Sequence, residues 1–450
     1  MGRLFGTDGV RGIANIELTC ELAMQIGRAT AMVLTADKSR PKVLIGTDTR
    51  ISSGMLESSI AAGLCSVGVD VLLLGVVPTP AVAFLVKEYN YDAGIMISAS
   101  HNPCEYNGIK IFSSDGYKLP DRVEEKIESI ILDDIAVIPE ASGEYVGRIT
   151  YNISAIYDYI SHLEKTVEDC DFRGMCIAVD CANGSSSATA EKLFKNVDVD
   201  CHIIASDPDG ININRDCGST HIENISRYVK SHPECQLGFS FDGDADRLIC
   251  VDENGNCVDG DKIIAICAKK LKSEGKLKNN TAVATVMSNM GLFKFCDING
   301  ISCVKTKVGD RYVLENMLEN GYNLGGEQSG HIIFLDYAST GDGQLTALQL
   351  LRVVKKSGKK LSELVSEIKV YPQVIKNVKV SQMGKIRFVS DESIKIAIKE
   401  AEKELGNKGR VLVRVSGTEP LVRVMLEGED EKLIEHLASE IAQVVEERLM

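Results

Sequence analysis

A serine, a histidine and a lysine that could together transfer a charged group lie within residues 97–110. Ser100 supplies a hydroxyl, His101 follows it with an imidazole, and Lys110 adds an amine at the end of the segment. The apolar run 93–97 predicts a strand that ends just before the serine, where α/β folds place their ligands. An ordinary Ser- and Asn-stabilised turn would explain the first half of the segment, but not the added lysine.

Carboxylates occupy alternate positions in a second segment, at Asp242, Asp244 and Asp246, and Arg247 follows them. Apolar runs on both sides predict two strands, so the three carboxylates would share one tight turn. Three hard oxygen donors so placed suit Mg²⁺. A solvated acidic hairpin is the simpler explanation for an Asp-rich turn, but the apolar flanks and the embedded arginine favour a metal site.

The same spacing imitates a calcium-binding EF-hand loop, with Glu253 at the twelfth position. The sixth position, where that loop requires glycine, is Arg247, and the flanks alternate like strands. A non-enzymatic calcium-binding module is therefore a remote alternative. Serine hydrolysis is a weaker rival to phosphoryl transfer on Ser100, because the chain has no G-x-S-x-G elbow and no evident acid to orient His101.

A glycine-rich segment at residues 325–331 carries a carboxylate and a hydroxyl between two apolar runs. Glu327, Ser329 and His331 are its polar members. Such groups can hydrogen-bond the vicinal hydroxyls of a sugar. A plain glycine-rich loop would be the preferred interpretation if the segment stood alone.

A fourth segment has the composition of a phosphate-binding loop. Its anion-binding members are Arg414, Ser416, Gly417, Thr418 and Arg423. Guanidinium groups match phosphate oxygens in pairs, and glycine lets backbone N–H groups approach closely. A β-turn decorated with surface arginines is the alternative.

The composition indicates a large folded protein with an anionic rather than a basic surface. A chain of 450 residues exceeds one ordinary core and predicts several domains. The net charge of -14 opposes nonspecific nucleic-acid binding, which needs clustered Lys and Arg. A small anionic substrate can still bind where a few cations converge.

No targeting or membrane signal is evident in the sequence. No apolar run approaches the roughly 18–20 residues that span a bilayer, and the N-terminus lacks the apolar core of a signal peptide. We therefore expect a cytoplasmic protein with no membrane partner. The 14 cysteines include no CxxC pair, so most are interpreted as reduced, small core residues.

Strand and helix patterns predict an α/β protein with a different C-terminal part. Apolar runs near residues 43–48, 176–180 and 282–289 predict strands, and helical patterns follow at 53–64, 187–194 and 291–298. This order indicates three similar α/β domains with mixed, mostly parallel sheets covered by helices. The last part predicts an α+β domain, with strands at 373–380, 410–415 and 421–427 and helices at 393–405 and 431–449.

Polar stretches suggest where these domains meet. They lie near residues 139–145, 254–256 and 371–372. The expected domains are therefore 1–150 with the serine loop, 151–254 with the acidic loop, 255–370 with the glycine-rich loop, and 371–450 with the phosphate-binding loop.

In this order and separation, the four loops resemble the α-D-phosphohexomutase family, and the opening segment at residues 5–12, which contains Arg11, extends the resemblance over essentially the whole chain. The resemblance implies four domains around a central cleft. It also implies that Ser100 carries a phosphoryl group, as phosphoserine, and joins Asp242, Asp244 and Asp246 around one Mg²⁺ per subunit. One departure is Ala245, where many relatives have glycine.

The opening segment, the serine loop and the glycine-rich loop are most similar to those of bacterial members that act on glucosamine phosphates. The resemblance implies interconversion of glucosamine 6-phosphate and glucosamine 1-phosphate through a bound 1,6-bisphosphate, which feeds UDP-N-acetylglucosamine and cell-wall synthesis. Glucosamine or glucose 1,6-bisphosphate would act as intermediate or activator. A phosphomannomutase or phosphoglucomutase of the same family is the alternative.

The resemblance also implies roles for individual residues. Arg11, Arg247 and Lys110 would balance the negative charge, and Lys110 would be the general base if neighbouring cations lower its pKa; His101 is the alternative base. Glu327, Ser329 and His331 would bind the sugar, while the fourth loop would hold its far phosphate on a domain hinged near residues 371–372. A homodimer is expected from the family, and a kinase, a bisphosphorylated sugar or self-transfer are open routes to the first phosphorylation.

Overall fold

The computed structural model describes residues 3–6, 8–35, 38–133, 140–416 and 420–450. The chain divides into two compact units. The first unit comprises Met1–Met287 and Gly300–Ser366, and the second comprises Ser288–Asn299 and Glu367–Met450. Three sheets belong to the first unit and one to the second. None of the helices formed by the described residues combines the length and apolar character that a bilayer crossing needs.

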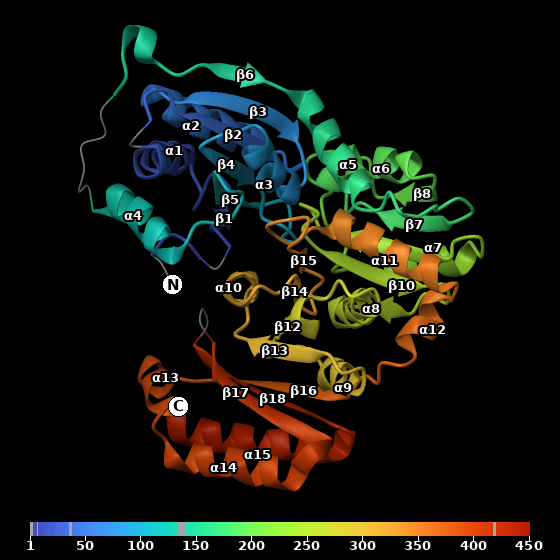
Figure 1. The fold of residues 1–450 in the computed structure, drawn as a ribbon. Coiled ribbons are helices and arrows are strands. Elements are labelled where there is room, and N and C mark those ends of the chain that lie inside the picture. Colours follow the sequence, from blue (N-terminus) through green and yellow to red (C-terminus); the bar gives the residue numbers. More distant parts are fainter. Residues whose placement is uncertain (1–2, 7, 36–37, 134–139, 417–419) are drawn as a thin grey trace. The chain divides into compact units, whose positions relative to one another are not determined.

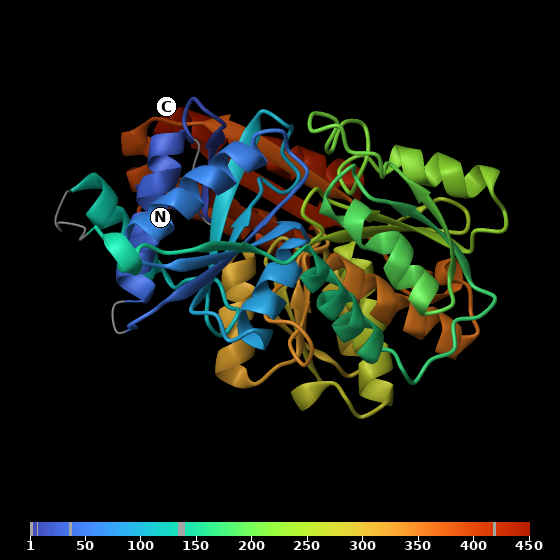
Figure 2. The ribbon, with the colours of Figure 1, turned by 90° about the horizontal axis from the view of Figure 1, so that it is seen from above.

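The first sheet is mixed, and helices cover both of its faces (Figure 1, Figure 2). In spatial order its strands are β1 (Val10–Ile13), β5 (Tyr106–Ser113), β4 (Ala93–Ile97), β2 (Lys42–Thr47), β3 (Asp70–Val76) and β6 (Ile149–Tyr151). Strands β4, β2, β3 and β6 run parallel, β5 runs antiparallel to β4, and β1 runs antiparallel to β5. The accompanying helices are α1 (Cys20–Leu34), α2 (Ser53–Ser66), α3 (Thr79–Glu88) and α4 (Asp121–Leu132).

Strand β2 shows why helices must cover both faces of this sheet. Ile45 packs in one core with Ile26 of α1 and Ile60 of α2. Gly46, the next residue, lies against Val82 of α3. Because consecutive strand residues point to opposite faces, an apolar run without polar alternation is stable only between two helical layers.

The second sheet has a parallel centre and an antiparallel edge. Its spatial order is β11 (Cys257–Val258), β10 (Leu248–Asp252), β9 (Leu237–Phe241), β7 (Cys176–Asp180) and β8 (Asp200–Ile204). Its helices are α5 (Ile156–Lys165), α6 (Ala190–Asn196) and α7 (Glu223–Ser231). The helix expected from residue 187 starts later, since a 3₁₀ turn at Ser185–Ala188 precedes it. There Ser186 Oγ donates to the Cys181 carbonyl, a local bond that competes with regular helix.

The third sheet is smaller and completes the first unit. Its order is β13 (Ser302–Thr306), β12 (Thr281–Thr285), β14 (Leu324–Gly326) and β15 (Ile332–Phe334). The helices around it are α8 (Gly260–Ser273), α10 (Asp310–Asn320), α11 (Gly343–Ser357) and α12 (Leu361–Val365). Val283 and Ile333 of the sheet pack with Val313 and Met317 of α10.

Four further short 3₁₀ turns lie in different parts of the described chain, at Gly143–Tyr145, Ile153–Ala155, Lys278–Asn280 and Gly406–Lys408.

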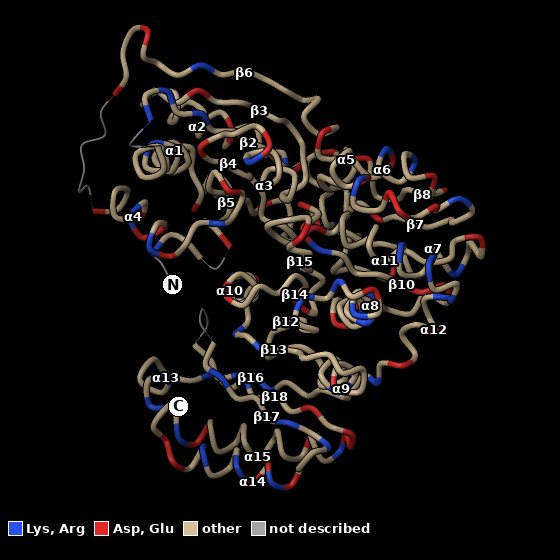
Figure 3. The backbone as a smooth tube through the Cα atoms, viewed as in Figure 1, with Lys and Arg blue, Asp and Glu red and all other residues tan. Residues whose placement is uncertain are grey.

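The second unit contains an antiparallel sheet packed on helices. Strand β18 (Leu421–Gly428) lies between β16 (Gln373–Lys379) and β17 (Gly409–Val415). The helices are α13 (Gln382–Phe388), α14 (Glu392–Leu405) and α15 (Glu431–Leu449). Lys and Arg positions are interspersed with Asp and Glu positions along α14 and α15 (Figure 3), as expected of helix faces that meet solvent. The fold class predicted from the sequence is confirmed, although α13 was not anticipated.

Helix α9 (Met290–Ile298) belongs to the second unit, although it follows a strand of the third sheet. Asn289 exchanges two hydrogen bonds of 3.0 Å with the backbone of Tyr371. The Met290 N–H donates to Glu427, a fully buried carboxylate. The predicted hinge at residues 371–372 therefore falls inside this unit. The chain crosses between the units at 287–288, 299–300 and 366–367 instead.

Candidate active site

Ser100 lies in the loop that begins where β4 ends at Ile97, as the apolar run predicted. Its φ of 51° places it in the left-handed region, which is uncommon for a residue with a side chain. The Ser100 N–H donates to Ser98 Oγ at 2.9 Å, and Ser98 Oγ donates to Asp48 Oδ2 at 2.7 Å. Hydrogen bonds beneath the loop thus compensate for its backbone strain.

Arg50 anchors the backbone carbonyls of the serine loop. The sequence did not indicate this role. The Arg50 side chain is fully buried, and Nε donates to Asp48 Oδ2 at 2.9 Å. The two terminal nitrogens donate to the carbonyls of Ser100, Asn102 and Pro103. Asn214 donates to two of the same carbonyls, those of Ser100 and Asn102. Nothing local marks these residues, because the loop carbonyls that they bind come from distant parts of the chain.

The acidic loop connects β9 to β10 and meets the serine loop. Ser100 Oγ donates to Asp242 Oδ2 at 2.5 Å, across 142 positions of sequence. The approach requires glycine at position 243, since a Cβ there would lie 2.6 Å from the Ser100 carbonyl oxygen. The two segments singled out from the sequence are therefore brought together. The loop lies between two antiparallel strands, and this contradicts the EF-hand interpretation, which needs two helices.

The three aspartates fit a hard divalent cation. One carboxylate oxygen from each of Asp242, Asp244 and Asp246 lies within 4.8 Å of the others, and all three residues are buried. Asp244 Oδ1 and Asp246 Oδ1 are buried without a hydrogen-bond partner among the described residues. Burial, with repulsion from Asp246 and Asp244, raises the pKa of Asp242 well above its usual value. A cation would satisfy these oxygens and remove the repulsion.

Ala245, at the tip of this loop, has a φ of 57°. Alanine in the left-handed region costs roughly 1–2 kcal/mol. Glycine at this position would avoid that cost.

Lys110 neutralises the acidic loop. Its Nζ lies 2.8 Å from Asp244, 3.2 Å from Asp246 and 3.1 Å from Asp8. Burial alone would lower the pKa of Lys110, but the three carboxylates outweigh burial and raise it well above its ordinary value. The lowered pKa that a general base requires is thus absent from this arrangement. Arg11, which was expected from the sequence to balance negative charge, forms an ion pair with Asp8.

His101 and Arg247 form a second pair at the site. Arg247 donates through a terminal nitrogen to His101 Nδ1 at 3.1 Å. Burial and the charges of Arg247 and Arg11 lower the pKa of His101 to about 4, so its imidazole is neutral at neutral pH. The Arg247 backbone N–H donates to Asp242 at 3.1 Å, which links this pair to the acidic loop.

The glycine-rich loop lies between β14 and β15, as expected. Its three polar residues differ from one another in their exposure to solvent. Glu327 is partly exposed and accepts from the Gly309 N–H at 3.1 Å, and Ser329 is exposed. His331 is buried, 3.6 Å from both Asp246 and Asp310. Burial lowers the pKa of His331, but these two carboxylates outweigh it and the net shift is upward.

Lys118 and Asp310 extend this network and were also missed. Lys118 Nζ lies 2.5 Å from Asp8 and 2.5 Å from Asp310. The ion pairs therefore run from the first sheet through Lys118 to α10 of the third sheet. A single Lys or Asp gives no sequence signal for such a role, although Asp8 lies in the opening segment that carried the resemblance.

The fourth loop can be described only in part, because Gly417 and Thr418 lie outside the described residues. Arg414 and Arg423 are directly opposite each other on β17 and β18. Burial and the charge of Arg423 lower the pKa of Arg414. Like charges in register destabilise a strand pair, and a bound anion would relieve the repulsion. Ser416, two residues after Arg414 in the sequence, is buried.

Models of one family match four successive parts of the chain. The phosphoglucomutase/phosphomannomutase models match residues 2–136 as α/β/α domain I, 157–255 as domain II, 259–371 as domain III and 375–444 as the C-terminal domain. Among curated proteins, the phosphoglucosamine mutase of Acetivibrio thermocellus is 58% identical and that of Ruminiclostridium cellulolyticum is 55% identical. Each alignment covers 100% of both chains.

Solved structures share the fold at lower identity. A phosphoglucomutase/phosphomannomutase family protein from Burkholderia thailandensis aligns with a TM-score of 0.83 at 24% identity, covering 100% of this chain and 98% of that chain. The N-acetylphosphoglucosamine mutase of Aspergillus fumigatus, solved with GlcNAc-6P and magnesium, aligns with a TM-score of 0.68 at 16% identity, covering 100% and 96%. The chain belongs to the phosphoglucomutase/phosphomannomutase family, the α-D-phosphohexomutases.

Proposed function

We propose that the protein is a phosphoglucosamine mutase that interconverts glucosamine 6-phosphate and glucosamine 1-phosphate, with Ser100 as the phosphoryl carrier. The observation that carries this proposal is the contact between Ser100 Oγ and the buried acidic loop at 2.5 Å. Relatives of that name, 54–58% identical over their whole length, support the choice of substrate.

Asp242, Asp244 and Asp246, with the phosphate on Ser100, would hold one Mg²⁺. The three buried carboxylates support this assignment, as does the magnesium named for the Aspergillus enzyme. When bound, the cation neutralises charge that develops on a transferring phosphoryl group.

The cations of the site keep the charge in balance. Three carboxylates and a phosphoserine of about -2 exceed the charge of one divalent cation. Lys110, Arg247 and Arg11 supply the remaining positive charge. Their fixed positions in the hydrogen-bond network stabilise the transferring phosphoryl group without rearrangement at the moment of reaction.

Two groups are alternatives for the general base. The neutral imidazole of His101 can accept a proton at neutral pH, although Arg247 occupies its Nδ1. Lys110 can act only if its carboxylate partners turn away or are neutralised. The pH dependence of kcat in His101→Gln separates them: loss of the acidic limb assigns the base to His101, and an unchanged limb assigns it to Lys110.

Glu327, Ser329 and His331 are assigned to the sugar, and the fourth loop to its far phosphate. The exposed Ser329 and partly exposed Glu327 can reach sugar hydroxyls. His331 contacts Asp246 in this structure, so its role in sugar binding would be indirect, through the position of that carboxylate. Arg414, Ser416, Gly417, Thr418 and Arg423 would anchor either phosphate of the 1,6-bisphosphate as it turns end for end.

The decisive experiment compares kcat/KM for glucosamine, glucose and mannose phosphates in a coupled assay. We expect glucosamine 6-phosphate to be preferred; a preference for mannose 6-phosphate would replace the substrate while keeping the mechanism. Ser100→Ala should abolish turnover. Mass spectrometry should detect phosphate on Ser100 in the wild-type protein and none at this position in the variant. Ser98→Ala keeps the Ser100 hydroxyl and removes only its support, so it should slow turnover without abolishing it. Normal rates in Ser100→Ala would refute the phosphoryl-carrier assignment.

Other expectations stay predictions. They are a cytoplasmic location, a homodimer, activation by glucosamine or glucose 1,6-bisphosphate, and first phosphorylation by a kinase or by self-transfer.

A further inference from the structure

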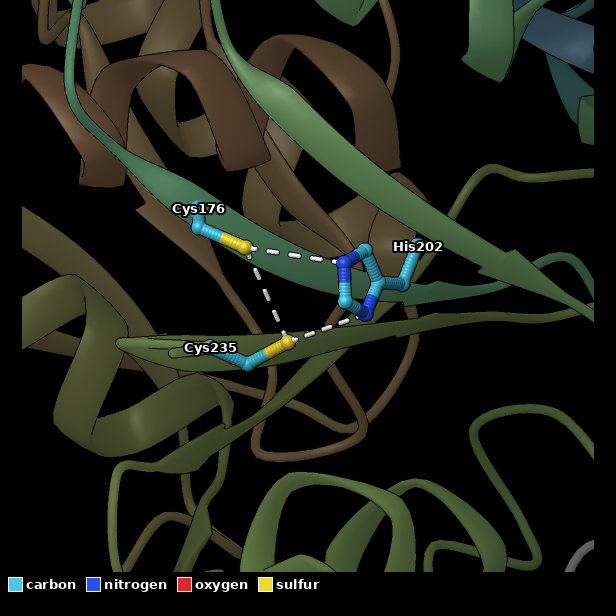
Figure 4. A group of neighbouring side chains, drawn as sticks. All are labelled: Cys176, His202 and Cys235. Atoms are coloured by element: carbon cyan, nitrogen blue, oxygen red, sulfur yellow. Dashed lines mark hydrogen bonds between the residues drawn. The ribbon is translucent and has the colours of Figure 1, made fainter. Parts of the chain in front are cut away.

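A group of soft metal ligands lies in the second sheet and has no part in the chemistry above. Cys176, His202 and Cys235 come from the start of β7, the middle of β8 and the residues before β9. One ligand atom from each lies within 4.8 Å of the others. Figure 4 shows the two sulfur atoms and the imidazole facing one another across the strands. The group and the three aspartates are the two such clusters found among the described residues.

The spacing of the two sulfurs fits a single thiophilic cation, and the imidazole lies within reach of both. The two Sγ atoms are 3.9 Å apart, Cys176 Sγ is 3.9 Å from His202 Nε2, and Cys235 Sγ is 3.5 Å from His202 Nδ1. In a tetrahedral zinc site, Zn–S bonds of about 2.3 Å and Zn–N bonds of about 2.0 Å place two sulfurs roughly 3.8 Å apart and sulfur and nitrogen roughly 3.5 Å apart. The sulfurs thus need little movement, but the two sulfur–nitrogen distances involve different ring nitrogens, so the imidazole must turn for one nitrogen to meet the same cation as both sulfurs.

Neighbouring residues orient the imidazole and favour positive charge. The Tyr228 hydroxyl of α7 lies 3.2 Å from His202 Nδ1, and its ring meets the imidazole edge-on. A hydrogen bond to one ring nitrogen fixes the tautomer that presents the other nitrogen to a metal. Asp200 and Glu234 are exposed and close enough to act electrostatically on both thiols. Cys176 and His202 are partly exposed, which gives a cation a path to the buried Cys235.

The cluster is separate from the acidic loop. Cys235 precedes β9 and Asp242 follows it, so the whole strand, Leu237–Phe241, lies between them. A strand rises about 3.3 Å per residue, and the two groups are therefore at opposite ends of the same sheet. Ligands of α/β enzymes bind at the carboxyl ends of the strands, whereas this cluster lies at their amino ends.

We propose that Cys176, His202 and Cys235 bind a thiophilic cation of the Zn²⁺ class. On binding, both thiols release a proton to solvent, two metal–thiolate bonds and one metal–imidazole bond form, and the fourth position is open to water. The cation would tie together the start of β7, the middle of β8 and the residues before β9. This role is independent of the mutase assignment, since it uses none of the residues given a part in phosphoryl transfer.

Cobalt is the probe that distinguishes this site from the aspartates. Full-length protein, kept reduced and saturated with Mg²⁺, would be titrated with Co²⁺ without oxygen. Thiolate ligands give a charge-transfer absorption in the near ultraviolet that carboxylates do not. We expect this band to saturate at one equivalent and to disappear when Zn²⁺ is added. Zn²⁺ should also raise the melting temperature.

Variants test the ligand set. Cys176→Ser and His202→Gln should remove the band, and both change partly exposed residues, so folding should survive; Cys235→Ser should do the same if it folds. Tyr228→Phe should keep the band and weaken Zn²⁺ binding roughly tenfold. Cys201→Ser is the matched control, because Cys201 neighbours His202 on β8 and points to the other face. Asp244→Asn should also keep the band.

Three results would overturn the proposal. They are a wild-type protein without the band, a band that persists in Cys176→Ser, and a Cys176–Cys235 disulfide in protein isolated with reductant. None of them bears on mutase activity, which is measured separately.

Discussion

Replacing Arg50 with lysine should damage both the stability of the first unit and the rate of turnover. The guanidinium group is fully buried and makes one hydrogen bond to Asp48 and three to the carbonyls of Ser100, Asn102 and Pro103. Lysine keeps the charge and the attraction to Asp48. It has only three donors on one nitrogen, however, and lacks the planar fork that reaches several carbonyls.

The magnitude follows from the hydrogen bonds that lysine cannot replace. A hydrogen bond to a charged group contributes about 1.5–3 kcal/mol, so losing one or two should cost roughly 2–4 kcal/mol. Asn214 still donates to the Ser100 and Asn102 carbonyls and limits the loss. For a unit of this size, we expect a fall in melting temperature of roughly 3–5 °C. Because a shift of about 1 Å in a reacting group can cost about 100-fold in rate, kcat should fall by up to that factor.

Calorimetry and the coupled mutase assay would measure the two effects. KM for glucosamine 6-phosphate should change little, because Arg50 lies beneath the loop and was assigned no substrate contact. Arg173→Lys is the matched control: Arg173 also pairs with a nearby aspartate, Asp171, but both are exposed, and such pairs contribute little. A kcat within threefold of wild type, in a folded variant, would refute the positioning role. An unchanged melting temperature would refute the energetic reasoning.

Three further predictions concern single residues. Asp244→Asn should weaken Mg²⁺ binding at least tenfold in calorimetry, because it removes a buried anionic oxygen; equal affinity would exclude Asp244 as a ligand. Arg423→Ala should raise KM roughly 10–100-fold with a smaller change in kcat, as expected for a lost charge-assisted phosphate contact; a pure kcat effect would contradict phosphate anchoring. Burial raises the pKa of Asp342 from 3.8 to about 6, so ionising it costs stability as the pH rises through that window. Asp342→Asn should therefore gain melting temperature relative to wild type between pH 4 and pH 7, and a constant difference would show that the carboxyl does not titrate there.

Several features of the site follow from the sequence alone because they are local. The apolar run 93–97 and the serine that follows it form β4 and its loop as predicted. The alternating runs around the acidic segment form β9 and β10. Strand periodicity and turn chemistry operate over a few residues, so the pattern is visible without the fold. The three strands of the second unit were predicted on the same basis.

Other features depend on residues that meet only in the folded chain. Arg50, Asn214, Lys118 and Asp310 bind partners far away in sequence and carry no local pattern. The directions of the pKa shifts are equally nonlocal. Lys110 was expected to meet cations that would lower its pKa, but the fold surrounds it with three carboxylates that raise it.

The cysteines illustrate the same division. From the sequence, Cys176 is one small residue in an apolar run, and no CxxC spacing marks a metal site. Pairing of parallel strands places it beside His202 and Cys235. The sequence determined which strands exist and which loops carry chemistry, because those depend on short-range pattern. Which side chains face one another was decided by sheet order and register, which only the tertiary structure establishes.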